Sequence, residues 1–280
     1  MDGATWTAKR FIGREPLAGP GAEHLWRARD ALAPLESPPV VLKEVHEPGE
    51  RAALAAEVDL LLRLDHPALR RVLAHGRGEG GSVAVLEHVD GVDLSAHLAE
   101  RGSDARRCAL ELLRALVYLH AAGLVHNDLK PQNVLVSAGT VRLIDLGLAA
   151  PVGEDRRGGT GGFLPPEHER GGKASVAGDL FAWGATMRAT GAHLDDRLRR
   201  AVDACLSPDP SRRPATADGV LGMLGAAPRP VDRTGRPARV GGAEALDAIE
   251  DALSSLGGAS VVVEAAPGAG RSRLVRDGIR

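Results

Sequence analysis

The sequence predicts an α+β protein with two lobes, a small strand-rich lobe containing one helix and then a larger helical lobe. Short apolar segments separated by turn residues dominate the first ninety residues, a pattern that indicates short strands. From about residue 104 onward the apolar residues recur at helical spacing instead. A chain of 280 residues is long enough to bury two cores, so the length also favours two lobes or two domains.

The first lobe is predicted to contain strands at 38–45 (PPVVLKEV) and 82–89 (SVAVLEHV), with a weaker strand at 22–30. Between them, residues 50–65 form a predicted amphipathic helix. We expect Pro67 to follow its end, because proline lacks an N–H group and restricts the residue before it. The apolar face of this helix is predicted to consist of Leu54, Val58, Leu61 and Leu62.

The second lobe is predicted to begin with a long helix that starts at a cap residue, Asp104, and stops at Gly123. Two short strands, 133–136 and 141–145, follow it and are joined by the turn SAGT at 137–140. One face of the long helix is predicted to carry Leu110, Leu113, Val117 and His120.

A glycine-rich loop is predicted over 147–172, followed by two helices at 176–190 and 194–206. Residues 225–242 are rich in Pro, Gly and Arg and show no periodicity, which indicates a linker. Residues 243–280 then contain a predicted helix, a short apolar strand and the loop APGAGRS.

Charge and composition exclude several classes of function. The 35 basic and 37 acidic residues nearly cancel, so no strong field is available to attract nucleic acid or a membrane surface. The two cysteines, Cys108 and Cys205, lack metal-ligand spacing and are predicted to be reduced residues on apolar helix faces. We find no signal-peptide pattern and no stretch close to the ~18 apolar residues of a membrane span, so we expect a soluble, cytoplasmic protein.

A series of short motifs follows one order along the chain. Any one of them has an ordinary explanation, since a lone lysine in a strand is usually a solvated edge charge. In this order the set resembles the protein kinase family over about residues 10–225, specifically its bacterial-type Ser/Thr branch. The motifs are Lys43 in a strand, Glu57 in the next helix, HNDLKPQN at 126–133, DLG at 145–147, PPE at 165–167, Asp179 and DPSRRP at 209–214.

The resemblance implies a two-lobed protein kinase fold with a small antiparallel sheet, divided into lobes at 1–88 and 89–224. It implies that ATP and Mg²⁺ are used to phosphorylate a protein hydroxyl, with Asp128 accepting or orienting the proton of that hydroxyl. It also places Lys130 near the γ-phosphate, as in Ser/Thr kinases. The implied cofactor-binding residues are Lys43, Glu57, Glu87, Val89, Leu25, Val41, Leu135, Asn133 and Asp145, of which Asn133 and Asp145 are the metal ligands.

Two further sets of residues are implied to support the fold. The family stacks side chains between its lobes at the positions of Leu61, Val72, His126 and Leu146, with Asp179 anchoring them from below. Glu167 and Arg213 match a pair that ties the end of the activation segment to the last helices, and Leu86 is implied to lie behind the nucleotide pocket.

Three departures from the family pattern affect what we expect. Ala18, Pro20 and Glu23 stand where the glycine-rich loop normally has glycines, unless Gly19 and Gly21 shift the register, and this change weakens the expectation of tight ATP binding.

Asn127 replaces the usual Arg, and an amide cannot form a charge-assisted fork with a phosphate. Activity is therefore predicted not to depend on phosphorylation of Thr160, whose hydroxyl is expected to matter through a hydrogen bond near Asp128. The third departure is the short link between helices 176–190 and 194–206, which lacks the usual docking insertion and weakens the expectation of peptide recognition.

Residues 261–275 (VVVEAAPGAGRSRLV) resemble the Walker A region of ATPases that follow some bacterial Ser/Thr kinases. Arg271 stands in place of the Lys and Ala265 in place of the first Gly. A partial P-loop-like α/β segment at 243–280 is the preferred interpretation, and a flexible Gly/Ala tail is the alternative.

The sequence therefore predicts an ATP- and Mg²⁺-dependent Ser/Thr protein kinase. A pseudokinase that binds nucleotides or partners is the alternative, and a kinase of small molecules is a weaker third one. The sequence does not indicate the substrate, the regulator or the oligomeric state.

Overall fold

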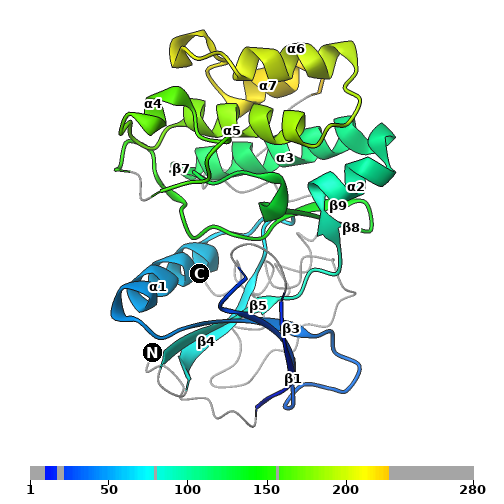
Figure 1. Ribbon diagram of the computed structural model, residues 1–280. Helices are drawn as coiled ribbons and strands as arrows, with labels where there is room; N and C mark the ends of the chain where they lie inside the picture. Colours follow the sequence, from blue (N-terminus) through cyan, green and yellow to red (C-terminus); the bar gives the residue numbers. More distant parts are fainter. Residues whose placement is uncertain (1–9, 18–21, 79–80, 156–157, 227–280) are drawn as a thin grey trace, which may run out of the picture.

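The computed structural model describes residues 10–17, 22–78, 81–155 and 158–226, which form two lobes stacked one on the other (Figure 1). The predicted two-lobed α+β architecture is confirmed for this part of the chain. The predicted segment at 243–280, most of the linker, and Ala18 and Pro20 lie outside the described residues.

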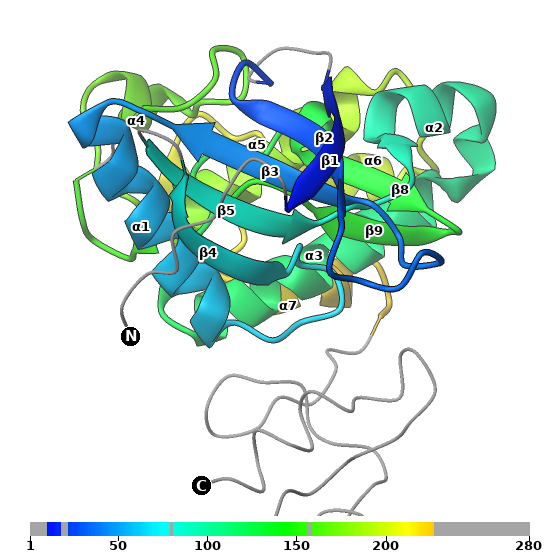
Figure 2. The same cartoon turned by 90° about the horizontal axis from the view of Figure 1, so that it is seen from below.

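The first lobe is a five-stranded antiparallel sheet with the strand order β1-β2-β3-β5-β4. Figure 2 views the molecule from this end and shows α1 (Pro48–Arg63) lying along one side of the sheet. The predicted strands are confirmed with slightly shifted ends. The strands are β1 (Phe11–Pro16), β2 (Leu25–Asp30), β3 (Val40–Val45), β4 (Val72–Gly78) and β5 (Gly81–Glu87).

Side-chain alternation in β3 determines what faces α1. Val40 and Leu42 pack on the face of the sheet away from the helix, with Phe11 and Val85. Val41 and Val45 pack on the opposite face, against Leu54 and Val58 of α1 and against Leu86 of β5. Because strand residues alternate between faces, Lys43 points to the same side as its neighbours Val41 and Val45, toward α1.

Helix α1 buries a stripe with the spacing i, i+3, i+4 and i+7, as an amphipathic helix should. The stripe contains Leu54, Val58 and Leu61, as predicted, and also Glu57. Leu62 was placed on this face wrongly, since it is 50% exposed. It lies one residue past Leu61, and a step of 100° turns it toward solvent.

The second lobe is built around α3, which is covered by the later helices (Figure 1). Its large buried cluster includes Leu112, Leu116, Trp183, Leu198 and Val220. The helices are α2 (Leu94–Glu100), α3 (Ala105–Ala121), α4 (Pro166–Glu169), α5 (Val176–Ala189), α6 (Asp196–Cys205) and α7 (Ala217–Met223), with 3-10 turns η1 (Gly102–Asp104), η2 (Pro131–Asn133) and η3 (Pro210–Arg212).

The second lobe also contains two small sheets of short strands, with the strand orders β6-β8-β9 and β10-β7. The strands are β6 (Val92–Asp93), β7 (Leu124–Val125), β8 (Val134–Ser137), β9 (Thr140–Leu143) and β10 (Ala150–Pro151). The predicted four-residue turn SAGT is shorter than expected, because Ser137 and Thr140 pair as the last residues of β8 and β9. Ala138 and Gly139 alone make the turn, both with positive φ (45° and 80°), which suits a tight hairpin.

Two predictions about α3 are wrong in detail. Asp104 stands at the N-cap position but its side chain makes no cap hydrogen bond and instead contacts His97 and Arg107. Of the predicted face only Leu113 is fully buried, whereas Cys108, Leu112, Leu116 and Leu119 are all 0% exposed. These residues are three or four positions apart, so the helix has one buried face, which is rotated from the predicted one.

Besides the 3-10 turns, five elements of more than two residues have weak sequence signals and were not predicted; one of them, the four-residue helix α4, lies within the loop that was expected at 147–172. Strand β4 contains two glycines and a histidine, strand β1 exposes every residue but Phe11, and helices α2 and α7 have seven residues each. Both cysteines are free and buried, as predicted, and burial raises the pKa of the Cys108 thiol to about 11.

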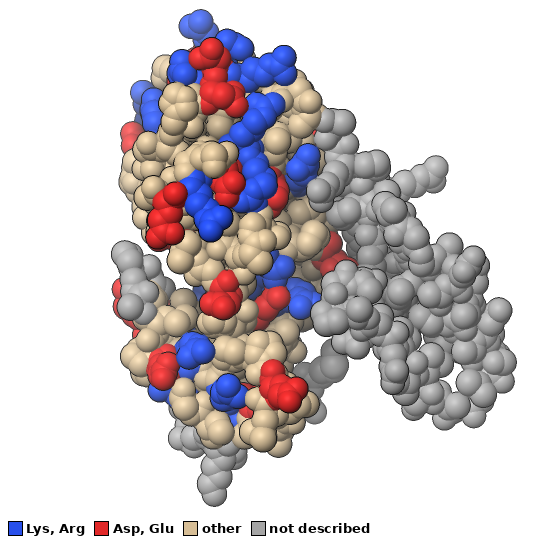
Figure 3. All heavy atoms as spheres, turned by 90° about the vertical axis from the view of Figure 1, so that its right-hand side faces the viewer, with Lys and Arg blue, Asp and Glu red and all other residues tan. Residues whose placement is uncertain are grey.

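Charged side chains of both signs are interspersed on the face drawn in Figure 3. Among the described residues, no helix combines the length and the apolar character needed to cross a membrane.

Candidate active site

A buried ion pair links the sheet to α1. Lys43 Nζ lies 2.6 Å from Glu57 Oε2, and the Glu57 side chain is only 4% exposed. The pair forms because the inward face of β3 and the buried stripe of α1 meet at these two residues. Lys43 Nζ also lies 3.9 Å from Asp145 Oδ1, so one cation connects the helix to the second lobe.

The protonation of this pair follows from its surroundings. Burial alone would lower the pKa of Lys43, but the negative charges of Glu57 and Asp145 outweigh it and raise the pKa. Burial likewise tends to raise the pKa of Asp145, but Lys43 and the N–H of Gly147 outweigh it, so this pKa is lowered. At neutral pH Lys43 is therefore a cation and Asp145 an anion.

Asp179, on α5, fixes the backbone that follows β7. It is 1% exposed and accepts hydrogen bonds from the backbone N–H groups of His126 (2.8 Å) and Asn127 (2.9 Å). Asn127 has φ of 66°, a left-handed conformation that Asn tolerates better than most residues. Its amide donates to the carbonyl of Leu148, 3.0 Å away, so it holds the start of the following loop.

Asp128 is the centre of a hydrogen-bond network. Its Oδ2 atom accepts from Lys130 Nζ at 2.8 Å and from Asn133 Nδ2 at 3.1 Å. Its Oδ1 atom accepts from the hydroxyl of Thr160 at 2.7 Å, and Lys130 also donates to this hydroxyl at 2.8 Å. The predicted hydrogen bond of Thr160 near Asp128 is confirmed.

Asn133 and Asp145 are held so that carbonyl and carboxylate oxygens remain available. Asn133 Nδ2 donates to the backbone carbonyl of Asp128 at 2.9 Å, which turns its Oδ1 atom away from that contact. The N–H of Gly147 donates to Asp145 Oδ1 at 2.9 Å. A Cβ atom at Gly147 would lie 3.1 Å from this oxygen, so the turn leaves little room for a larger residue.

These groups face one cavity of about 430 Å³ between the lobes. Of the predicted site residues, the cavity is lined by Leu25, Val41, Lys43, Glu57, Val89, Lys130, Leu135, Asn133 and Asp145. Leu86, which was expected behind the nucleotide pocket, is also among the lining residues. Asp128 does not line this cavity but adjoins it through Lys130 and Asn133. The Glu87 side chain is turned toward Arg71 and Arg142, so any role of Glu87 in the cavity must come from its backbone.

Several lining residues were missed by the sequence analysis. They include Leu17, Ala22, Arg70, His88, Gly91, Asp93, Gln132 and Ile144. Arg70 precedes the unpredicted strand β4, and no periodicity marks it as buried. Glu23, which stands at a glycine position of the family pattern, is exposed and does not line the cavity.

The two supporting sets also form. Arg213 makes a two-pronged pair with Glu167, with nitrogen–oxygen distances of 2.6 and 2.8 Å. Leu61 and Leu146 are buried in one cluster with Val72 packed against it, and His126 is 1% exposed.

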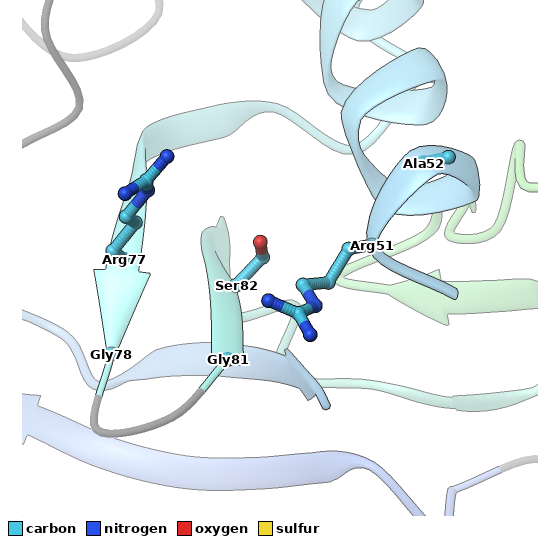
Figure 4. A pocket seen from close by; sticks show the side chains of 6 residues that line it. All are labelled: Arg51, Ala52, Arg77, Gly78, Gly81 and Ser82. Carbon is cyan, nitrogen blue, oxygen red and sulfur yellow. The ribbon is translucent and has the colours of Figure 1, made fainter. Parts of the chain in front are cut away.

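A second hollow, of about 540 Å³, lies between the start of α1 and the β4–β5 hairpin (Figure 4). In this view the guanidinium groups of Arg51 and Arg77 lie on either side of Ser82 and do not converge. None of the described lining residues is a carboxylate, so this hollow contains no pair of groups suited to acid–base chemistry.

Comparison with known proteins identifies the family. The sequence model of the "Protein kinase domain" family matches residues 37–194, and the chain belongs to this family. The chain is 35% identical over 183 residues to the Serine/threonine-protein kinase PknG of Mycolicibacterium smegmatis, covering 61% of this chain and 24% of that protein. It is 30% identical over 222 residues to PknG of Mycobacterium leprae, covering 66% of this chain and 29% of that protein.

The Serine/threonine-protein kinase PknA of Mycobacterium tuberculosis is 34% identical over 193 residues, covering 62% of this chain and 45% of that protein. The chain thus spans about a quarter to a half of the length of these relatives. The family match ends at residue 194, so it does not reach the predicted ATPase-like segment.

Proposed function

We propose that this chain is an ATP-dependent Ser/Thr protein kinase, which transfers the γ-phosphoryl group of ATP to a hydroxyl of a protein substrate. One observation carries the proposal: the Lys43–Glu57 pair of the first lobe and the Asn133–Asp145 pair of the second line one cavity. Phosphoryl transfer depends mainly on positioning and charge neutralisation, and these residues provide both.

In this proposal the nucleotide base lies between apolar side chains and the backbone of β5 and the segment after it. Leu25 and Val41 line the cavity from β2 and β3, and Leu135 lines it from β8. Glu87 and Val89 offer backbone groups to the base edge. Lys43 binds phosphate oxygens, and its ion pair with Glu57 fixes the direction of its side chain.

The residues present fit a Mg²⁺ site. Asn133 contributes its amide oxygen, since its nitrogen is engaged by the Asp128 carbonyl, and Asp145 contributes an ionised carboxylate. Oxygen ligands of this kind are those that Mg²⁺ prefers. Bound Mg²⁺ would neutralise phosphate charge.

Asp128 is proposed to accept or orient the proton of the substrate hydroxyl. Thr160 occupies Oδ1 of Asp128 with its own hydroxyl, so the network already accommodates a hydroxyl donor at this carboxylate. Lys130, bonded to Asp128 Oδ2, supplies positive charge beside it.

The test combines binding and activity. Mg-ATP should raise the melting temperature of the full chain, because a ligand that binds only the folded state stabilises it. Lys43→Ala should weaken this shift. Asp128→Asn should keep the shift and lose autophosphorylation by roughly 10²–10⁴-fold, the usual contribution of a positioned base. Asp155→Asn, a change at a 94% exposed carboxylate, is the control and should change neither.

Two further variants separate the predicted nucleotide sites. Arg271→Ala, or truncation after Gly225, should leave the Mg-ATP shift unchanged if the cavity between the lobes binds the nucleotide. A shift that survives Lys43→Ala but is lost on truncation would show that the cavity binds no nucleotide. The pseudokinase alternative would then replace our proposal.

A further inference from the structure

A buried cation lines the cavity between the lobes. Arg70 is 6% exposed and lines the cavity. Its Nη1 atom donates a long hydrogen bond of 3.4 Å to the carbonyl of Ile144, and its Nε atom has no hydrogen-bond partner among the described residues. Within the described part of the chain no carboxylate forms an ion pair with it.

Three carboxylates act on the charge of Arg70: Asp145, which lies 3.9 Å from Lys43, and two glutamates that are already paired. Glu57 is paired with Lys43, and Glu87 is paired with Arg71 and Arg142. Burial lowers the pKa of Arg70 to about 10, although Asp145 and the two glutamates oppose this. A buried charge without a partner destabilises the folded state, so a plain apolar side chain would pack here at lower cost. The contacts within the described residues therefore do not explain why a guanidinium group is buried here, and a bound ligand could be its partner.

The position of Arg70 relates it to the base end of the cavity. Its neighbour Arg71 accepts a backbone hydrogen bond from Glu87 at 2.9 Å, and Val72 pairs with Leu86. The charge of Arg70 also reaches His88, which lines the cavity just before Val89. The backbone of Arg70 thus adjoins the segment that is proposed to bind the nucleotide base, while its guanidinium group contacts the Ile144 carbonyl and is acted on by the charges of Asp145 and Glu57.

We propose that Arg70 reads the edge of the nucleotide base and makes the cavity accept a 6-oxopurine nucleotide such as GTP. The guanidinium group is a donor only. Guanine presents two acceptors, N7 and O6, on one edge, whereas adenine presents N7 beside an amino group that is itself a donor. A buried donor without a partner at this edge favours the oxo group. This inference rests on the proposed function, because it assumes that a purine nucleotide occupies the cavity.

The experiment measures the dissociation constants of Mg-ATP, Mg-GTP and Mg-ITP for the full chain by calorimetry, together with melting temperatures. Inosine carries the 6-oxo group without the 2-amino group of guanine, so ITP isolates the contribution of O6. The wild type should bind all three nucleotides. Arg70→Met should weaken the binding of GTP and ITP about tenfold or more, as expected for the loss of a two-pronged base contact. A tenfold change in a dissociation constant corresponds to about 1.4 kcal/mol, and the constant for ATP should change by less than about twofold.

Arg70→Met should also raise the melting temperature of the nucleotide-free protein, because it removes an unpaired buried charge. A purely structural role of Arg70 would lower it instead. Arg70→Lys keeps the charge and loses the fork, so it should reduce the preference for GTP and ITP even if the methionine variant folds poorly. Arg77→Met, at an exposed arginine of β4, is the matched control and should change no constant.

Several results would overturn the inference. Binding of ATP but not of GTP or ITP by the wild type would do so and leave the proposed function intact. An equal loss for all three nucleotides in Arg70→Met would show that Arg70 acts on the phosphates they share. Failure of every nucleotide to bind the wild type would remove the proposed function and this inference together.

Discussion

The Glu167–Arg213 pair is predicted to couple two distant segments strongly enough to measure. Arg213 follows η3 and its side chain is fully buried, whereas the Glu167 side chain, on α4, is 24% exposed. Arg213 also donates to the backbone carbonyls of Ser207 and Ala177, at 2.8 and 2.9 Å. Both carboxylate oxygens of Glu167 accept from it, so each single substitution leaves buried polar groups without partners.

The magnitude follows from these contacts. Removing one partner of a buried pair costs about 3–5 kcal/mol, and we expect Arg213→Met to fall in this range. Glu167→Gln keeps one acceptor and the partly exposed site is screened by water, so its cost should be about 1–3 kcal/mol. Each single substitution already removes the two charge-assisted hydrogen bonds between these residues. The double variant removes the same two bonds, so its cost should be smaller than the sum of the two single costs. We expect a coupling of about 2 kcal/mol, within the range of contacting residues.

The assay is urea denaturation of the wild type, both single variants and the double variant at pH 7, followed by circular dichroism. A parallel cycle on Arg199 and Asp196, whose side chains are 54% and 76% exposed, is the control and should show no measurable coupling. Additive effects of Glu167→Gln and Arg213→Met, within about 0.5 kcal/mol, would refute the reasoning.

Three further predictions concern the residues around Asp128. Burial tends to raise the pKa of Asp179, but the hydrogen bonds from His120 and His126 outweigh this effect and lower the pKa below its ordinary 3.8. The ionised Asp179 therefore stabilises the folded state above that pH, and this stabilisation is lost as the pH falls. Asp179→Asn should therefore destabilise the protein at pH 7 and make its unfolding free energy depend less on pH below about 4; an unchanged acid dependence would contradict this. Thr160→Ser should keep most of the phosphorylation rate and Thr160→Ala should not, because only the hydroxyl bonds to Asp128; equal rates would exclude a role for this hydrogen bond. Phosphatase-treated protein should keep its initial rate because Asn127 lacks a positive fork, and a lag that is removed by preincubation with ATP would show the opposite.

Local patterns were sufficient to predict the architecture of the described residues. Strand alternation and helical spacing depend on side chains within a few residues of one another, so β2, β3, β5, α1 and α3 could be located from the sequence. The motif order was sufficient to identify the family. The residues proposed to act at the site follow those motifs, and the structure places most of them around one cavity.

The tertiary structure decided which faces are buried and which distant groups meet. Leu62 and Leu61 have the same hydropathy, and only packing into the core cluster that also contains Leu146 selects Leu61. Thr160 reaches Asp128 across 32 residues, and Arg213 reaches Glu167 across 46, distances over which no periodic pattern extends.

Arg70 shows most clearly that burial depends on the tertiary structure. In the sequence it is one of two adjacent arginines, Arg70 and Arg71, before a weak strand. The backbone hydrogen bond from Arg70 to Leu143 directs one of them inward and leaves the other half exposed, with a side chain that is 59% accessible. Burial of a charge depends on what the rest of the chain packs around it, and a sequence pattern confined to neighbouring residues contains no information about that environment.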